Sequence, residues 1–211
     1  MKIVNKYLED LISIYNRNGW EIQEINTGAI RNLEGLESDG FNDILFHFSI
    51  TKNFLKIARG TTDPSAYYIK TGGIPKTGAP FLCSGFQEKI YCMDKHLQKY
   101  PALCNREWKG CYPQRYIRDA NRNFKLDENE KVVKGYASMN VHHAGSVPSE
   151  FIGKDSAGCQ VYMYKIDQEE QVNDLKAEKM YYGTKNITLW NYAIFELPYN
   201  KIIENIYGEL Y

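Results

Sequence analysis

Residues 44–50 read Ile44-Leu45-Phe46-His47-Phe48-Ser49-Ile50, and residues 54–59 read Phe54-Leu55-Lys56-Ile57-Ala58-Arg59. Both runs are rich in the β-branched and aromatic residues that favour strands. The polar Thr51-Lys52-Asn53 between them is typical of a hairpin connection. The chain as a whole has 17 tyrosines and 9 phenylalanines, a composition that also favours a strand-rich core. We therefore expect a β-hairpin at the centre of the fold.

The segments on either side of this hairpin predict a mixture of helices and strands. Apolar residues recur at helical spacing over residues 3–18, and Asn18-Gly19 is a usual helix end. Residues 21–40 are polar and contain several glycines, which predicts a connector. Further along we expect a turn at 60–64, loop at 71–80, strands at 66–69, 112–118, 135–142, 161–164 and 187–197, and a helix that Asp167 and Glu170 cap and Gly183 ends.

This pattern predicts an α+β fold dominated by strands, with one late helix and an N-terminal helical extension. With 211 residues, 43% of them hydrophobic, the chain can bury a substantial core as one domain with extensions. The expected division is an N-terminal helix and connector at 1–40, a main domain at 41–200 and a C-terminal tail at 201–211.

Charge and hydropathy argue against several classes of partner. The chain has 26 basic and 26 acidic residues, so no net field attracts nucleic acid or an anionic membrane. No uncharged run approaches the length of a membrane span, and residues 1–7 do not resemble an export signal. We expect synthesis in the cytoplasm, and all five cysteines to be free thiols.

A histidine and a later cysteine are the strongest candidates for chemistry. His142 ends a predicted strand, and Cys159 lies in the turn sequence Ser156-Ala157-Gly158-Cys159-Gln160. A nucleophile on a glycine turn can expose its sulfur while backbone N–H groups face a developing oxyanion. An imidazole nearby would serve as its base. If the strand persists, Asn140 and His142 share one face, so only one histidine of the pair His142-His143 can face the cysteine.

Several segments together resemble the catalytic domains of the L,D-transpeptidase (YkuD) family, and more closely a divergent group of bacterial and bacteriophage proteins with the same features. The resemblance covers about residues 42–197. The matching segments are Arg59-Gly60-Thr61-Thr62-Asp63-Pro64, Tyr100-Pro101-Ala102-Leu103, Arg118-Asp119-Ala120-Asn121-Arg122-Asn123, Asn140-Val141-His142 and Ser156-Ala157-Gly158-Cys159-Gln160-Val161.

The resemblance implies an L,D-transpeptidase-like mixed sheet or sandwich and a set of site residues. Cys159 would be the nucleophile, His142 the base that keeps it as a thiolate, and Ser156 and Gly158 would shape the turn. The substrate-binding positions would be His143, Gln160, Asn140 and Arg118. The chain departs from the family at Ala157, where the family has histidine, and at Gln160, where it has arginine or asparagine. His143 stands where the family has glycine.

The implied activity is attack on a peptide carbonyl of a peptidoglycan stem, giving a thioacyl-enzyme that passes to water or to an amine. A phage lysin-type hydrolase or a transpeptidase would both act in this way at the bacterial cell wall, after lysin-type release or as part of a virion. Two alternatives remain open at this point. One is a binding or virion structural module that keeps the fold without activity, and the other is a cytoplasmic cysteine protease.

The sequence contains two metal-like patterns, and neither leads us to expect a metal or other cofactor. Residues 119–130 carry oxygen side chains at the ligand positions of an EF-hand loop, but Phe124 stands where glycine allows the sharp turn. Cys104, Cys111, the histidine pair and Cys159 could supply zinc ligands, but the cysteines lack the close spacing of structural zinc sites.

Overall fold

The computed structural model describes residues 1–34, 39–74, 76–125, 127, 129–145, 149–181 and 188–211. It contains a nine-stranded mixed sheet, in the order β1-β4-β11-β10-β7-β6-β12-β2-β3, and a three-stranded sheet in the order β5-β8-β9. The strands are β1 Lys2–Ile3, β2 Ile25–Asn32, β3 Asp43–Ser49, β4 Phe54–Thr61, β5 Ala79–Leu82, β6 Gly85–His96, β7 Tyr100–Cys104, β8 Gln114–Asp119, β9 Val133–Gly135, β10 Val141–His143, β11 Gln160–Tyr162 and β12 Leu189–Leu197. The α-helices are α1 Leu8–Arg17, α2 Ala66–Thr71, α3 Lys165–Tyr181 and α4 Lys201–Tyr207. The predicted β-dominated α+β class is confirmed.

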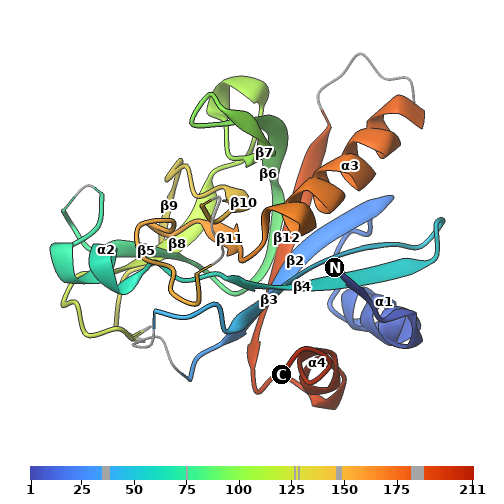
Figure 1. Ribbon diagram of the computed structural model, residues 1–211, viewed down its shortest axis with the longest axis horizontal. Coiled ribbons are helices and arrows are strands. Elements are labelled where there is room, and N and C mark those ends of the chain that lie inside the picture. Colours follow the sequence, from blue (N-terminus) through green and yellow to red (C-terminus); the bar gives the residue numbers. More distant parts are fainter. Residues whose placement is uncertain (35–38, 75, 126, 128, 146–148, 182–187) are drawn as a thin grey trace.

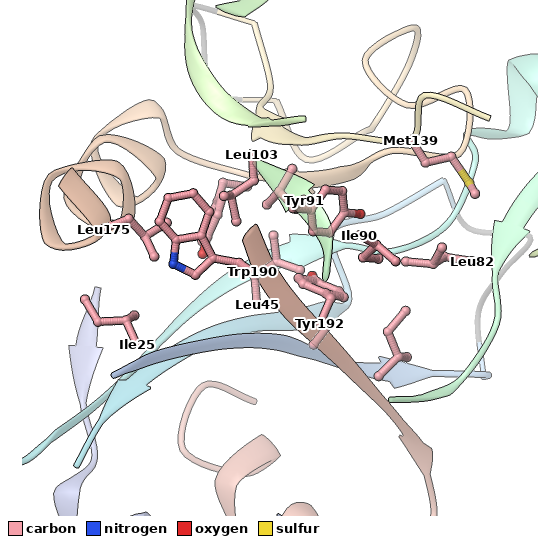
Figure 2. Packing of buried hydrophobic residues seen from close by; sticks show 14 of the residues in the cluster. Ile25, Leu45, Leu82, Ile90, Tyr91, Leu103, Met139, Leu175, Trp190 and Tyr192 are labelled. Atoms are coloured by element: carbon pink, nitrogen blue, oxygen red, sulfur yellow. The ribbon is translucent and has the colours of Figure 1, made fainter. Parts of the chain in front are cut away.

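The large sheet is covered on both faces, with α3 on one side and α1 and α4 on the other (Figure 1). The predicted hairpin is confirmed as β3 and β4, which pair from Asp43↔Gly60 to Ser49↔Phe54. Its side chains alternate between the two faces, so Leu45 packs in the α3-side core and Phe46 in the opposite core. Figure 2 shows the first of these cores, where Trp190 of β12 lies near Leu175 of α3.

The expected connector at residues 21–40 is wrong in its central part, because β2 there is a buried strand. It pairs with β12 in parallel and with β3 in antiparallel orientation. Gly28 is required by this packing, since a Cβ on it would lie 2.4 Å from the carbonyl oxygen of Ala193. Arg31, fully buried, forms ion pairs with Asp63 at 3.3 Å and Glu196 at 3.2 Å. The polar residues that suggested a loop thus find partners inside the protein, as the ion pairs of Arg31 show.

The ends of the chain also join the folded structure. The boundary at residue 40 falls between β2 and β3, which are paired neighbours in one sheet. The predicted helix at 3–18 begins only at Leu8, after the short strand β1 and a 3₁₀ turn. The expected tail at 201–211 contains α4, whose N-cap Asn200 accepts hydrogen bonds from two backbone N–H groups. Ile203 and Ile206 of this helix are buried in the core beside α1.

Two further strand predictions are corrected. Residues 66–69 lie in the helix α2, because the Ser65 side chain caps it and Gly72, at a φ of +88°, ends it. The strand expected at 135–142 is divided into β9 and β10, with Ser138 at a φ of +55° between them. The loop expected at 71–80 gives way to β5 at Ala79.

The strand predictions at 112–118 and 161–164 correspond to β8 and β11, which are shorter. The last predicted helix and strand correspond to α3 and β12, and the ends expected at Gly183 and Ile187 lie outside the described residues. Helix α3 begins at Lys165, so Asp167 lies inside its first turn. The Asp167 carboxylate accepts a hydrogen bond from the Met1 ammonium at 2.5 Å.

Candidate active site

Two short parallel strands bring Cys159 and His142 together. β10 and β11 pair in the register Val141↔Gln160 and His142↔Val161, and Asn140 accepts a backbone hydrogen bond from Gln160 at 2.9 Å. Cys159 therefore lies beside Asn140 and two residues before Val161, which pairs with His142. The N–H of Asn140 donates a hydrogen bond to Cys159 Sγ at 3.3 Å. The sheet pairing thus fixes the position of the sulfur relative to the histidine strand.

The turn before Cys159 depends on Ser156 and Gly158. Gly158 has a φ of +120°, and a Cβ on it would lie 2.4 Å from the carbonyl oxygen of Pro80. Only glycine fits both conditions. The buried Ser156 hydroxyl accepts a hydrogen bond from the Gly158 N–H at 3.2 Å and contacts the carbonyl oxygens of Asp63 at 2.7 Å and Cys159 at 2.8 Å. These contacts hold the backbone on which the sulfur is presented.

The imidazole of His142 is held in one tautomer. Its Nδ1 lies 2.8 Å from the carbonyl oxygen of His143, and a carbonyl oxygen can only accept a hydrogen bond. The proton of the neutral ring is therefore on Nδ1, and Nε2 carries a lone pair. His142 is buried, with 4% of its surface exposed. Nε2 is therefore the ring nitrogen that can accept a proton.

Burial sets the protonation states of the pair. It raises the pKa of the Cys159 thiol to about 11, against the smaller opposing effects of the Asn140 N–H and of Arg106. Burial, followed by the nearby His96, lowers the pKa of His142 to about 3. At neutral pH the pair is therefore a thiol and a neutral imidazole. These shifts favour a neutral resting pair over the thiolate that the resemblance implies.

Cys159 and His142 line one cavity of about 480 Å³, which we term the Cys159 cavity; Asn140, Ala157 and His96 also line it. A second cavity of about 650 Å³, the α3 cleft, lies between α3, the β6–β7 hairpin and β10. The two share five lining residues: His96, Leu97, His142, Lys154 and Asp155. A substrate can therefore extend from the sulfur into the α3 cleft.

His143 and Asn140 lie at the site, with different surroundings. His143 lines the α3 cleft, and its ring stacks on Tyr100 with centroids 4.2 Å apart. Asn140 is buried and hydrogen-bonded within the protein: its Oδ1 accepts from the Asn105 N–H at 3.1 Å, and its Nδ2 lies 3.2 Å from His96 Nδ1. Its side chain thus positions other groups at the edge of the cavity.

Two of the predicted substrate-binding residues are corrected. Gln160 is fully buried, and its amide donates to the Gly158 carbonyl at 3.1 Å and accepts from the Tyr91 hydroxyl at 2.6 Å. It therefore supports the turn from the core. Arg118 donates to the Gly78 carbonyl at 2.7 Å in the small sheet and lines neither cavity. Residue type suggested a polar contact in both cases, and the strands direct these side chains elsewhere.

The cavities also contain charged and polar residues that no sequence pattern assigned to the site, among them His96, Arg106, Lys154 and Asp155. His96 and Arg106 come from a region whose apolar pattern is broken. Strand β6 there runs for 12 residues, with left-handed backbone at Lys89 inside it and at Leu97 just after it. A lone histidine at a hairpin end carried no signal of its own.

The candidate metal patterns form no site in the described part of the chain, where no group of three or more His, Cys, Asp or Glu residues is arranged to hold a metal ion. In the loop at 119–130, the Asp119 carboxylate accepts backbone hydrogen bonds from Asn123 and Phe124, and Phe124 does adopt a left-handed φ of +62°. The thiols of Cys92 and Cys111 both contact the carbonyl oxygen of Cys104, at 3.4 Å and 3.6 Å.

Comparison of the chain with protein-family models, with curated proteins and with solved structures gave no match. None of the described helices is both long and apolar enough to cross a membrane.

Proposed function

We propose that the protein is a cysteine-dependent enzyme of peptidoglycan stem peptides, acting through a thioacyl-enzyme as a hydrolase or as an L,D-transpeptidase. The observation that carries the proposal is the arrangement of His142 and Cys159. A fixed imidazole with its lone pair on Nε2 and a thiol on a glycine turn line the same cavity. Thiol and base in one cleft are what nucleophilic acyl transfer needs.

The neutral resting pair defines the order of proton movement. As the sulfur attacks the substrate carbonyl, the thiol proton passes to His142 Nε2, and the electron pair of the C=O bond moves to oxygen. The His143 carbonyl, which binds Nδ1–H, stabilises the imidazolium that forms. Collapse expels the amine, which takes the proton from Nε2, and leaves a thioester on Cys159. Water or a second amine then attacks the thioester and releases the acyl group.

The charges around the cavities fit a peptide with free carboxylates. Arg106 and Lys154 line the Cys159 cavity, and Lys99, Lys165 and Lys176 line the α3 cleft. The acidic residues there are Asp155 and Glu169. Excess positive charge in a partly enclosed groove favours anionic ligands. Peptidoglycan stems carry such carboxylates, and the motif resemblance points to the same substrate and so to action at the bacterial cell wall.

The test is incubation with purified muropeptides followed by mass spectrometry. The wild-type protein is compared with Cys159→Ala, and with Cys83→Ala as a matched thiol outside both cavities. We expect the wild type and Cys83→Ala to give a cleaved or cross-linked product, and Cys159→Ala to give none. A gain of one water identifies hydrolysis, and a joined pair of stems identifies transpeptidation.

An unchanged muropeptide profile for the wild type would contradict the enzymatic proposal. Retained binding of muropeptides in that case would support the alternative of an inactive binding module on the same fold. Cleavage of an unrelated denatured protein, with muropeptides intact, would support the general protease.

A further inference from the structure

His96 lies against the proposed nucleophile–base pair without a role in the mechanism above. It ends β6, and its ring stacks on His142 with centroids 3.9 Å apart and planes 17° apart. Strand β7 lies between β6 and β10 in the sheet, so the two rings reach each other across it. His96 lines both the Cys159 cavity and the α3 cleft. It is thus placed where a substrate passing between them would lie.

A chain of hydrogen bonds fixes the tautomer of His96. The backbone N–H of Asn105 donates to Asn140 Oδ1 at 3.1 Å, which leaves Asn140 Nδ2 as the group that faces His96. This Nδ2 is a donor, so His96 Nδ1 at 3.2 Å accepts. The proton of the neutral His96 ring is therefore on Nε2. The same Asn140 also donates its backbone N–H to Cys159 Sγ, so one residue holds both groups.

The Nε2–H of His96 has no hydrogen-bond partner in the described part of the chain. It is not one of the fully buried side-chain atoms that lack a partner, so it is accessible from a cavity. Since the residue lines the two cavities, this donor is open to a ligand there. Burial and the charge of Arg106 lower the pKa of His96 to about 4. The ring consequently stays neutral at physiological pH, with its single proton on Nε2.

We propose that His96 is a catalytic residue whose Nε2–H donates a hydrogen bond to the oxygen of the carbonyl that Cys159 attacks. During attack the S–C bond forms and the C=O electron pair moves to oxygen, where the His96 donor stabilises the negative charge. No proton leaves His96, and the thiol proton passes to His142. The inference rests on the proposed function in that Cys159 must be the nucleophile, but it does not depend on the peptide substrate.

The test compares two reactions of Cys159 that differ only in the need for an oxyanion. Acylation by 4-nitrophenyl acetate forms an S–acyl bond, breaks the ester C–O bond and releases 4-nitrophenolate through a tetrahedral oxyanion. Alkylation by iodoacetamide displaces iodide without one. Both rates are measured for the wild type, Cys159→Ala and three variants of His96. His96→Phe keeps an aromatic ring on His142, His96→Leu fills part of the space without any polar atom, and His96→Gln returns an amide donor near the position of Nε2.

We expect His96→Phe and His96→Leu to slow acylation by about 10²-fold while alkylation stays within about threefold, since one oxyanion donor contributes that much. His96→Gln should recover at least about tenfold of the lost acylation rate. If one of the first two variants fails to fold, the other gives the same comparison, because each lacks the donor.

Equal losses in acylation and alkylation would assign His96 a packing role and overturn the proposal, as would unchanged acylation in the donor-free variants. Identical release of nitrophenolate by wild type and Cys159→Ala would show that Cys159 is not the nucleophile. That result would overturn the proposed function as well. Acylation of Cys159 without any effect on muropeptides would contradict only the peptidoglycan substrate and leave the His96 result standing.

Discussion

The protonation state of Cys159 gives the most direct test of the site. Burial raises the pKa of its thiol to about 11, and only a thiolate reacts with an alkylating reagent. At pH 7, about four units below that pKa, the thiolate fraction is about 10⁻⁴. Raising the pH removes the thiol proton, so the alkylation rate should rise about tenfold per pH unit between pH 6 and 10. His142, with a pKa of about 3, stays neutral over this range, so its titration adds no second inflection to the pH profile of the alkylation rate.

The assay is the initial rate of iodoacetamide labelling at each pH, read by mass spectrometry on the peptide that contains Cys159. Cys83, a half-buried thiol outside both cavities, is labelled in the same samples and serves as the internal reference. In His142→Gln the Cys159 profile should keep its shape, since a neutral imidazole does not stabilise the thiolate.

A plateau for Cys159 below pH 7 would refute this reasoning, because it would require a resting thiolate–imidazolium pair. A profile that moves to higher pH in His142→Gln would refute it in the same way. Either result would restore the protonation state that the sequence resemblance implied.

Two further predictions concern the turn and the buried charges. Gly158→Ala should lower the free energy of unfolding by about 3 kcal/mol or more, since strained backbone combines with a clash against Pro80, whereas Gly153→Ala, at a φ of +60° with open space around it, should lose only about 1–2 kcal/mol. Equal losses in urea unfolding would contradict the steric argument. Arg31→Met should cost about 3–5 kcal/mol by leaving the buried Asp63 without its partner, while the exposed Arg17→Met should change stability by no more than about 0.5 kcal/mol. A Tm for Arg31→Met within a degree or two of wild type would show that the network contributes little.

Local patterns predicted the parts of the fold whose conformation depends on near neighbours. The hairpin of β3 and β4 follows from two apolar runs and a polar turn, and β12 and α3 follow from similar signals. Strand β2 could not be found in this way. Its Thr27, Gly28 and Arg31 are strand residues only because β12 and distant loops supply partners and space for them. The helix α2 was missed because its serine cap and glycine end outweigh its aromatic residues.

The sequence by itself determined the chemical groups of the candidate site: a thiol on a Ser-x-Gly-Cys turn and a histidine before it. The positive φ of Gly158 and the hydrogen bond from its N–H to Ser156 are local features. The contacts of the same turn with Pro80 and Asp63 come from the tertiary structure. The tertiary structure decided which histidine nitrogen is free, turned Gln160 into the core and stacked His96 on His142. Burial in the fold favours the neutral thiol and imidazole over the charged pair. Proton affinity depends on burial and on groups that the sheet brings from distant strands, and the spacing of residues along the chain does not contain that information.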